Sequence, residues 1–257
     1  MTDNPKLEKV TETLSIYQQS GVFFYGTDAV LLSAYASASL YKNQNADGIE
    51  LCSGTGFAAL SMLDKFPKLR MSALEINEHA CRLSEMSAQK SGLSERFSVI
   101  CGDVCKIKNK DGDMKNLLPE NFDFVLCNPP YMTADCGKMC SDDYKTIARH
   151  EILCKIDDIF AAASFLLGTG GSLFIVYRPD RLSSLFSGAA KNGFEIKRLT
   201  FVCSKADRAP VLVLCEAKKQ AKEGLVMTKP FIIYDENGNY TDEMLRVARE
   251  GVMTFGK

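Results

Sequence analysis

A junction of strand, glycine loop and helix constrains the fold of this chain most. A predicted strand ends in Glu50-Leu51-Cys52-Ser53-Gly54-Thr55-Gly56, and residues 57–63 then have the apolar spacing of an amphipathic helix. Gly54 and Gly56 let the backbone turn tightly and approach a ligand closely, with the N-terminal amides of a helix behind them. No third glycine follows at the spacing of a dinucleotide-binding loop. The junction indicates an α/β fold that binds a ligand at this loop.

Two further predicted strands end in acids. Residues 70–76 contain Glu75, roughly 20 residues beyond the glycine loop, where a nucleotide-binding fold places the carboxylate that binds ribose hydroxyls. Residues 97–101 are followed by Gly102 and Asp103, and the Asp103 carboxylate is suited to accept a hydrogen from an adenine amine. Because ligands of open α/β sheets bind at the carboxyl ends of the strands, we expect both acids beside the glycine loop. For each acid alone, the alternative is an ordinary helix cap or turn residue.

The strand predicted over residues 122–127 leads into Asn128-Pro129-Pro130-Tyr131. Asn128 and Pro129 each precede a proline, so this loop is extended and stiff. The Asn128 amide oxygen and the neighbouring backbone carbonyl can accept both hydrogens of a planar exocyclic amine, while the Tyr131 ring stacks on the base or amide that carries it. Such acceptors favour the pyramidal geometry from which the nitrogen attacks a methyl group. The alternative is a proline-rich strand exit with a surface tyrosine.

Strands and helices alternate along the chain, which predicts a parallel, doubly wound α/β sheet. The N-terminal part contains a strand-like segment over residues 13–25 and a helix capped by Thr27 or Asp28. The remaining expected elements are a helix over residues 78–91, a loop or short helix over 106–120, a mobile lid over 132–145, a helix over 156–167 and a strand over 172–177. Residues 195–203 and 210–218 are joined by a short polar loop and predict an antiparallel hairpin.

Length and composition favour one domain. With 257 residues and 46% hydrophobic content, the chain can bury a full core over residues 1–257, divided into an N-terminal cap (1–45), a core (46–218) and a C-terminal extension (219–257). The first ten residues do not resemble a signal peptide, and no apolar run is long enough for a bilayer, so we expect no membrane partner. The ten cysteines are scattered, several of them in apolar strands, and indicate buried thiols in a reducing cytoplasm.

One group of possible metal ligands stands out. Cys136, Cys140, His150 and Cys154 could close a tetrahedron, but their spacing fits no common zinc pattern, and we expect no metal.

The formal net charge of -1 does not by itself indicate a nucleic-acid-binding protein. RNA binding needs a local basic surface, and basic residues in loops beside the catalytic edge are the best candidates. This criterion selects Arg149, Arg178 and Arg208.

Taken together, these motifs resemble the class I S-adenosylmethionine methyltransferases, and within them the amino-group methylators marked by Asn-Pro-Pro-Tyr. Residues 24–32 resemble a signature that lies over the cofactor in the bacterial tRNA adenine-N6 methyltransferases acting next to the anticodon of valine tRNA. Residues 147–151, 170–179 and 204–208 match the same family, so the resemblance extends from residue 24 to residue 243. Tyr25 departs from the pattern, since a phenylalanine or an arginine is commoner there.

The resemblance implies a seven-stranded sheet with an antiparallel C-terminal hairpin, S-adenosylmethionine as cofactor, and methyl transfer to the N6 amine of an adenine in tRNA. Guanine N2 in rRNA, a protein glutamine amide, or cofactor binding without turnover are the alternatives. The implied catalytic residues are Asn128, Pro129, Pro130 and Tyr131. The implied cofactor-binding residues are Tyr25, Gly26, Thr27, Asp28, Cys52, Ser53, Gly54, Thr55, Gly56, Glu75, Ile76, Asp103, Val104 and Asn128. Neither the tRNA species nor the oligomeric state follows from the sequence.

Overall fold

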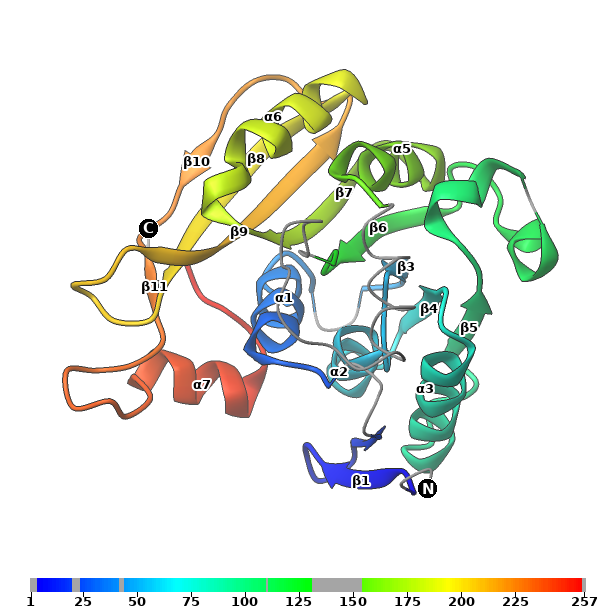
Figure 1. The fold of residues 1–257 in the computed structure, drawn as a ribbon, viewed down its shortest axis with the longest axis horizontal. Coiled ribbons are helices and arrows are strands. Elements are labelled where there is room, and N and C mark those ends of the chain that lie inside the picture. Colours follow the sequence, from blue (N-terminus) through cyan, green and yellow to red (C-terminus); the bar gives the residue numbers. More distant parts are fainter. Residues whose placement is uncertain (1–3, 20–23, 42–43, 110, 131–153, 256–257) are drawn as a thin grey trace, which may run out of the picture.

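A computed structural model describes residues 4–19, 24–41, 44–109, 111–130 and 154–255 of the chain. A nine-stranded sheet lies at its centre, with helices on both faces (Figure 1). The strands of this sheet are β3 (Ala46–Leu51), β4 (Leu69–Glu75), β5 (Phe97–Cys101), β6 (Phe122–Cys127), β7 (Leu167–Tyr177), β8 (Phe194–Cys203), β9 (Pro210–Lys219), β10 (Val226–Met227) and β11 (Phe231–Ile232). A separate hairpin consists of β1 (Lys6–Lys9) and β2 (Ser15–Gln18).

The helices alternate with the strands. The α-helices are α1 (Thr27–Ser37), α2 (Phe57–Lys65), α3 (Glu78–Lys90), α5 (Ile156–Leu166), α6 (Leu182–Lys191) and α7 (Asp242–Glu250), and the 3-10 helices are η1 (Val104–Asn109), η2 (Gly112–Asn116) and η3 (Pro179–Arg181). None of the helices in the described ranges is long and apolar enough to cross a membrane.

The sheet has the predicted α/β topology. Its strand order is β10-β8-β9-β7-β6-β3-β4-β5, and β9 is antiparallel to both β7 and β8 whereas the other pairs are parallel. The seven strands from β8 to β5 form the predicted sheet with its antiparallel hairpin. The two-residue strands β10 and β11 both pair with β8, so the sheet has more strands than we predicted.

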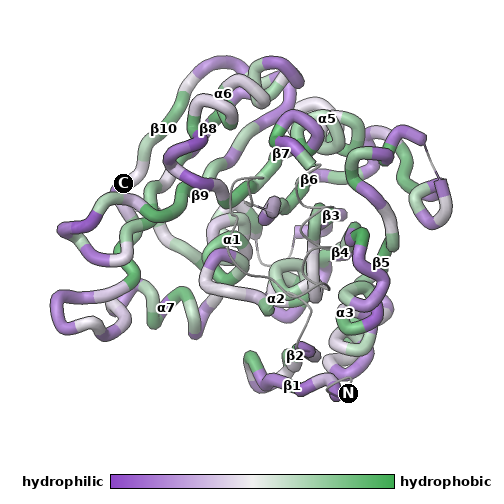
Figure 2. Tube along the Cα trace, viewed as in Figure 1, coloured by the Kyte–Doolittle hydropathy of each residue, from purple (hydrophilic) through white to green (hydrophobic). Residues whose placement is uncertain are grey.

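The sheet is buried on both faces because successive side chains of its central strands point into different cores. In β6, Phe124 and Leu126 belong to the core that also contains α1, α2 and α7, whereas Val125 and Cys127 belong to the core under α5 and α6. In Figure 2 the central strands β6 and β7 are largely hydrophobic, whereas hydrophilic residues are common in the outer loops.

Three local predictions were wrong. Only Ser15–Gln18 of the segment over residues 13–25 is a strand within its described part, and it pairs with β1, which we did not predict. Gly26, rather than Thr27 or Asp28, is the N-cap of α1. Strand β7 begins at Leu167, so the glycine-rich residues 168–171 belong to the strand instead of preceding it.

Candidate active site

The glycine loop connects β3 to α2 through several left-handed residues. Cys52, Gly54 and Gly56 have φ values of 55°, 54° and 73°. Gly56 is the N-cap of α2 and its N–H donates to the Ser53 carbonyl at 2.8 Å. A Cβ atom on Gly56 would lie 2.3 Å from the Ser84 hydroxyl oxygen, whereas a Cβ atom on Gly54 would meet nothing within 4 Å in the described structure. Gly56 is therefore needed for packing, and Gly54 faces open space.

Glu75, the last residue of β4, is hydrogen-bonded to this loop. Its Oε2 atom accepts the Gly54 N–H at 2.8 Å, and its Oε1 atom accepts the Asn77 N–H at 2.9 Å. Burial raises the pKa of the Glu75 carboxyl group, and the hydrogen bonds from Asn77 and Gly54 oppose that rise. The carboxylate thus holds the glycine loop and the start of α3 at one point.

Asp103 lies at the next strand end. Cys101 of β5 pairs with Glu75, and the Gly102 N–H donates to the Glu75 carbonyl at 2.9 Å. The Asp103 carboxylate accepts the Cys105 N–H at 2.9 Å and lies 3.6 Å from Lys106 Nζ. The predicted edge that joins the glycine loop, Glu75 and Asp103 is confirmed. Of the neighbouring predicted residues, Ile76 is exposed and Val104 is buried.

Asn128 follows β6 on the other side of the glycine loop. Cys127 pairs with Leu51 of β3 and with Ile175 of β7, so Asn128 lies beside the start of the glycine loop at the same sheet edge. Pro129 is buried, and Tyr131 lies outside the described residues.

The segment that precedes α1 lies against the start of α2. The Tyr25 ring stacks on the Phe57 ring at a centroid distance of 3.8 Å, and its hydroxyl donates to Glu8 at 2.7 Å. Asp28 lies in the first turn of α1. Burial raises the pKa of Asp28, and the positive charge of Arg178 partly opposes this rise. Residues 25–28 are thereby brought close to the glycine loop and to the end of β7.

The described basic residues predicted for RNA binding are at the same edge of the sheet. Arg178 follows β7 directly, and Arg208 is exposed in the turn between β8 and β9. The end of β6 is level with Cys215 of β9, so the β8–β9 turn lies two to three strands to the side and several residues further along the strand direction. Arg149 lies outside the described residues.

Glu50 is a buried acid to which the sequence reasoning gave no role. It lies in β3 with 3% exposure, and its Oε2 atom accepts the Ala59 N–H of α2 at 2.9 Å. Burial raises the pKa of Glu50 to about 8, against the effect of that hydrogen bond, and the negative charge of Glu75 adds to the rise. The sequence signal that could have identified Glu50 as a buried acid is its position inside a predicted strand, next to apolar residues.

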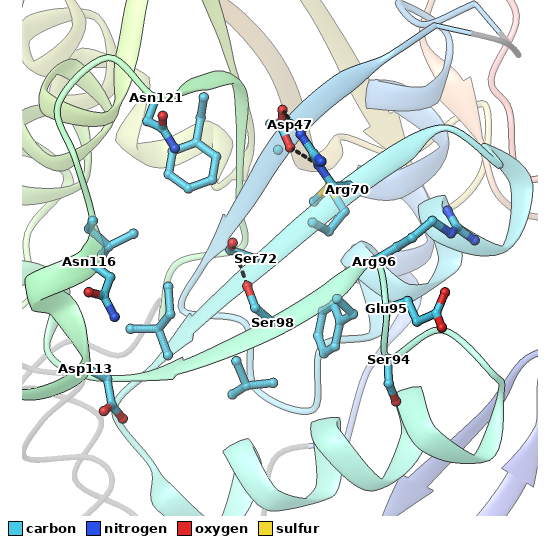
Figure 3. A pocket seen from close by; sticks show the side chains of 17 residues that line it. Asp47, Arg70, Ser72, Ser94, Glu95, Arg96, Ser98, Asp113, Asn116 and Asn121 are labelled. Carbon is cyan, nitrogen blue, oxygen red and sulfur yellow. Dashed lines mark hydrogen bonds and ion pairs between the residues drawn. The ribbon is translucent and has the colours of Figure 1, made fainter.

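A cavity of about 590 Å³ lies at the other end of the strands (Figure 3). It is bordered by the Asp47–Arg70 ion pair, with an N–O distance of 2.7 Å, and by the hydrogen-bonded hydroxyls of Ser72 and Ser98. Asp47 and Arg70 pair near the amino ends of β3 and β4. The cavity is therefore separate from the edge that carries Glu75 and Asn128.

The carboxyl edge fits a nucleoside cofactor with an attached charged group. Ser53 has a buried hydroxyl oxygen without a hydrogen-bond partner in the described part of the chain. Gly54 leaves open space next to it, and Glu75 and Asp103 bring carboxylates suited to ribose and adenine.

The chain matches the family model described as "Methyltransferase small domain" over residues 13–184. A tRNA1(Val) (adenine(37)-N6)-methyltransferase from Porphyromonas gingivalis is 29% identical over 225 residues, covering 86% of each chain. A protein of the same name from Actinobacillus succinogenes is 26% identical over 231 residues, covering 90% of each.

The fold is similar to that of a solved structure from Agrobacterium tumefaciens, described as a predicted O-methyltransferase. The TM-score is 0.68 at 18% identity, and the match covers 88% of this chain and 98% of the other. At this identity, the likeness concerns the fold and not the acceptor atom.

Proposed function

The chain belongs to the methyltransferase small domain family, and we propose that it transfers a methyl group from S-adenosylmethionine to the exocyclic N6 amine of an adenine in tRNA, next to the anticodon. The relatives that match this chain over most of their length are named as tRNA adenine-N6 methyltransferases, and this supports the proposed acceptor. A tRNA substrate also favours location in the cytoplasm.

The observation that carries the proposal is the position of Asn128 one strand away from the glycine loop. Adjacent strands are about 4.8 Å apart, which is close enough for an acceptor held at Asn128 to meet a group held at residues 54–56. The cofactor, when bound, supplies a methyl group on a positively charged sulfur.

The protein has to orient the amine. We propose that the Asn128 side-chain oxygen and the Pro129 carbonyl accept its two hydrogens, so that the nitrogen lone pair points toward the glycine loop. A strong general base is not required because the proton can leave after methyl transfer. Stacking of the adenine on Tyr131 remains a prediction.

The cofactor is proposed to lie along the rest of the edge. Glu75 would bind the ribose hydroxyls, Asp103 the adenine amine, and residues 25–28 would lie over the bound molecule. Arg178 and Arg208 would contact RNA phosphates, together with Arg149.

The test is nucleoside mass spectrometry of tRNA incubated with the protein and S-adenosylmethionine labelled in its methyl group. We expect labelled N6-methyladenosine, and Asn128→Ala protein as the control should yield little. Bulk protein and rRNA should be incubated in parallel. Label in protein glutamine or in guanine, and not in tRNA adenine, would contradict the proposed acceptor while leaving the methyltransferase family unaffected.

A further inference from the structure

Four thiols gather at the carboxyl edge of the sheet, next to the proposed active site. Cys52 follows β3, and Cys127 is the last residue of the neighbouring strand β6. Cys105 lies in η1, and Cys154 lies just before α5. The Cys52 thiol lies close to those of Cys127 and Cys154, and the Cys154 thiol also lies close to that of Cys105. Segments far apart in the sequence thus place their sulfur atoms in one chain of contacts.

Two of these thiols and one carboxylate have the arrangement of metal ligands. The sulfur atoms of Cys105 and Cys154 and a carboxylate oxygen of Asp158 all lie within 4.8 Å of one another. A tetrahedral ion with metal–sulfur bonds of about 2.3 Å holds its sulfur ligands roughly 3.8 Å apart, so small side-chain movements would close the site. Cys105 is exposed, which leaves a path for an ion from solvent.

The Asp158 carboxylate is already oriented by the protein. It lies in the first turn of α5, where its Oδ2 atom accepts the Lys155 N–H at 2.9 Å. A hydrogen bond of this kind fixes the direction of a ligand before the metal binds. The Asp158 carboxylate, in the first turn of α5, and the Cys154 thiol, just before the cap of this helix, therefore lie close together.

Cys52 adds a feature of the backbone. It is a non-glycine residue with φ of 55°, a conformation that glycine adopts without strain. A cysteine here places its sulfur next to Cys154, and strained residues of this kind cluster at functional sites.

We propose that Cys105, Cys154 and Asp158 bind a thiophilic divalent cation, for which zinc is the best chemical match. Sulfur ligands favour zinc, whereas magnesium and calcium prefer oxygen ligands alone. On binding, each thiol releases its proton to solvent, so two thiolates and one carboxylate surround the ion, and a fourth position remains for water or Cys52. The ion would join η1 to the start of α5, where the chain returns from the Asn128 loop. This inference does not depend on the identity of the methyl acceptor.

The test is titration of the metal-free, reduced full-length protein with Co²⁺ and Zn²⁺. Co²⁺ in a site with two thiolates gives an intense sulfur-to-metal charge-transfer absorption, and Zn²⁺ should displace it. We expect one ion per chain, and a loss of affinity of at least roughly 100-fold in Cys105→Ser and Cys154→Ser, with about tenfold loss in Asp158→Asn. Cys203→Ser, which changes a buried cysteine at the end of β8, is the matched control and should bind like the unsubstituted protein.

Circular dichroism checks that each variant is folded. If Cys154→Ser does not fold, the comparison of Cys105→Ser with the unsubstituted protein decides the test, because Cys105 is exposed. Absence of the absorption in the unsubstituted protein would overturn the proposal. Unchanged affinity in Cys105→Ser would do the same, because it would assign the ion to other ligands. Cys136, Cys140 and His150, which the sequence groups with Cys154 as possible ligands, lie outside the described residues.

Discussion

Glu75 Oε2 accepts the backbone N–H of Gly54 at 2.8 Å, which ties the end of β4 to the loop that follows β3. The other carboxylate oxygen accepts the Asn77 N–H at 2.9 Å, so each oxygen holds one backbone N–H group in place. Each oxygen keeps a second lone pair that can accept a hydrogen bond from a ribose hydroxyl. One side chain thereby shapes the glycine loop and is proposed to contact the cofactor.

This double role leads to the first prediction. Glu75→Gln would place an NH₂ group against one of the two backbone N–H donors, so we expect cofactor affinity to fall by roughly 10- to 100-fold, with a smaller change in kcat at saturating cofactor. Isothermal titration calorimetry with S-adenosylmethionine measures the affinity. Glu78→Gln, an exposed change in α3, is the control. Equal affinity in both variants would remove Glu75 from the binding site.

Asn128 should affect the reaction rather than cofactor binding. For Asn128→Ala we expect the cofactor dissociation constant to stay within about twofold and kcat to fall by roughly 100-fold or more, because the amide oxygen acts mainly in the transition state. Asn128→Asp keeps acceptor oxygens and should retain more activity than the alanine variant. Single-turnover methylation of tRNA gives these rates. An alanine variant as fast as the unsubstituted enzyme would refute the amine-orienting role.

The proposed RNA-binding arginines predict a salt dependence. The logarithm of tRNA affinity should fall linearly with the logarithm of salt concentration, and removing one arginine that binds a phosphate should make the slope shallower by about 0.7–0.9. We therefore expect Arg178→Ala and Arg208→Ala each to flatten the slope. Arg82→Ala is the matched control, since Arg82 is an exposed arginine in α3 beside an acid. Filter binding from low to high salt is the measurement, and identical slopes throughout would move the RNA surface elsewhere.

The sheet edge could be predicted because its signals are local. The glycines after β3, the acid that ends β4 and the acid after β5 are each recognisable from neighbouring residues, and the rule that parallel strands share one carboxyl edge brings them together. The same holds for the antiparallel hairpin of β8 and β9, where two apolar runs are separated by a short polar turn.

Features that depend on distant pairing could not be predicted. The strands β10 and β11 have two residues each and exist because they meet the edge of β8. The left-handed backbone of Cys52 and its contact with Cys154 need the register of β3 with β6 and the return of the chain at α5. Likewise, the perturbed pKa of Glu50 follows from burial, which only the assembled helices and sheet create.

The two loop glycines should differ when changed to alanine. Gly54→Ala should lower the free energy of unfolding by about 1–2 kcal/mol, because the backbone is left-handed there, and by no more than this, because the added Cβ meets nothing. The same change should weaken cofactor binding. Gly56→Ala has the same strain plus a contact of 2.3 Å with the Ser84 hydroxyl oxygen, so we expect a larger loss of stability. Urea unfolding gives both values.

Adding Ser84→Ala to Gly56→Ala should recover part of the loss, because the closest contact disappears while the backbone strain remains. Equal stability of the Gly54 and Gly56 variants would show that the crowding at Ser84 is relieved without cost.

The last prediction concerns pH and Glu50. Its pKa is about 8 in the folded chain and 4.5 is the ordinary value, so between these pH values the folded state holds a proton that the unfolded state has lost. The contribution of Glu50 to the free energy of unfolding is therefore fully retained below pH 4.5 and decreases as the pH rises through about 8.

The side chain in Glu50→Gln cannot titrate. Relative to the unsubstituted protein, we expect similar stability at pH 5 and a gain on the order of 2–4 kcal/mol at pH 8.5, given about 1.4 kcal/mol per pKa unit. Urea unfolding across this range, with Glu78→Gln as the exposed control, measures the difference. Stability curves for Glu50→Gln and the unsubstituted protein that stay parallel from pH 5 to pH 8.5 would mean that Glu50 does not carry the buried proton.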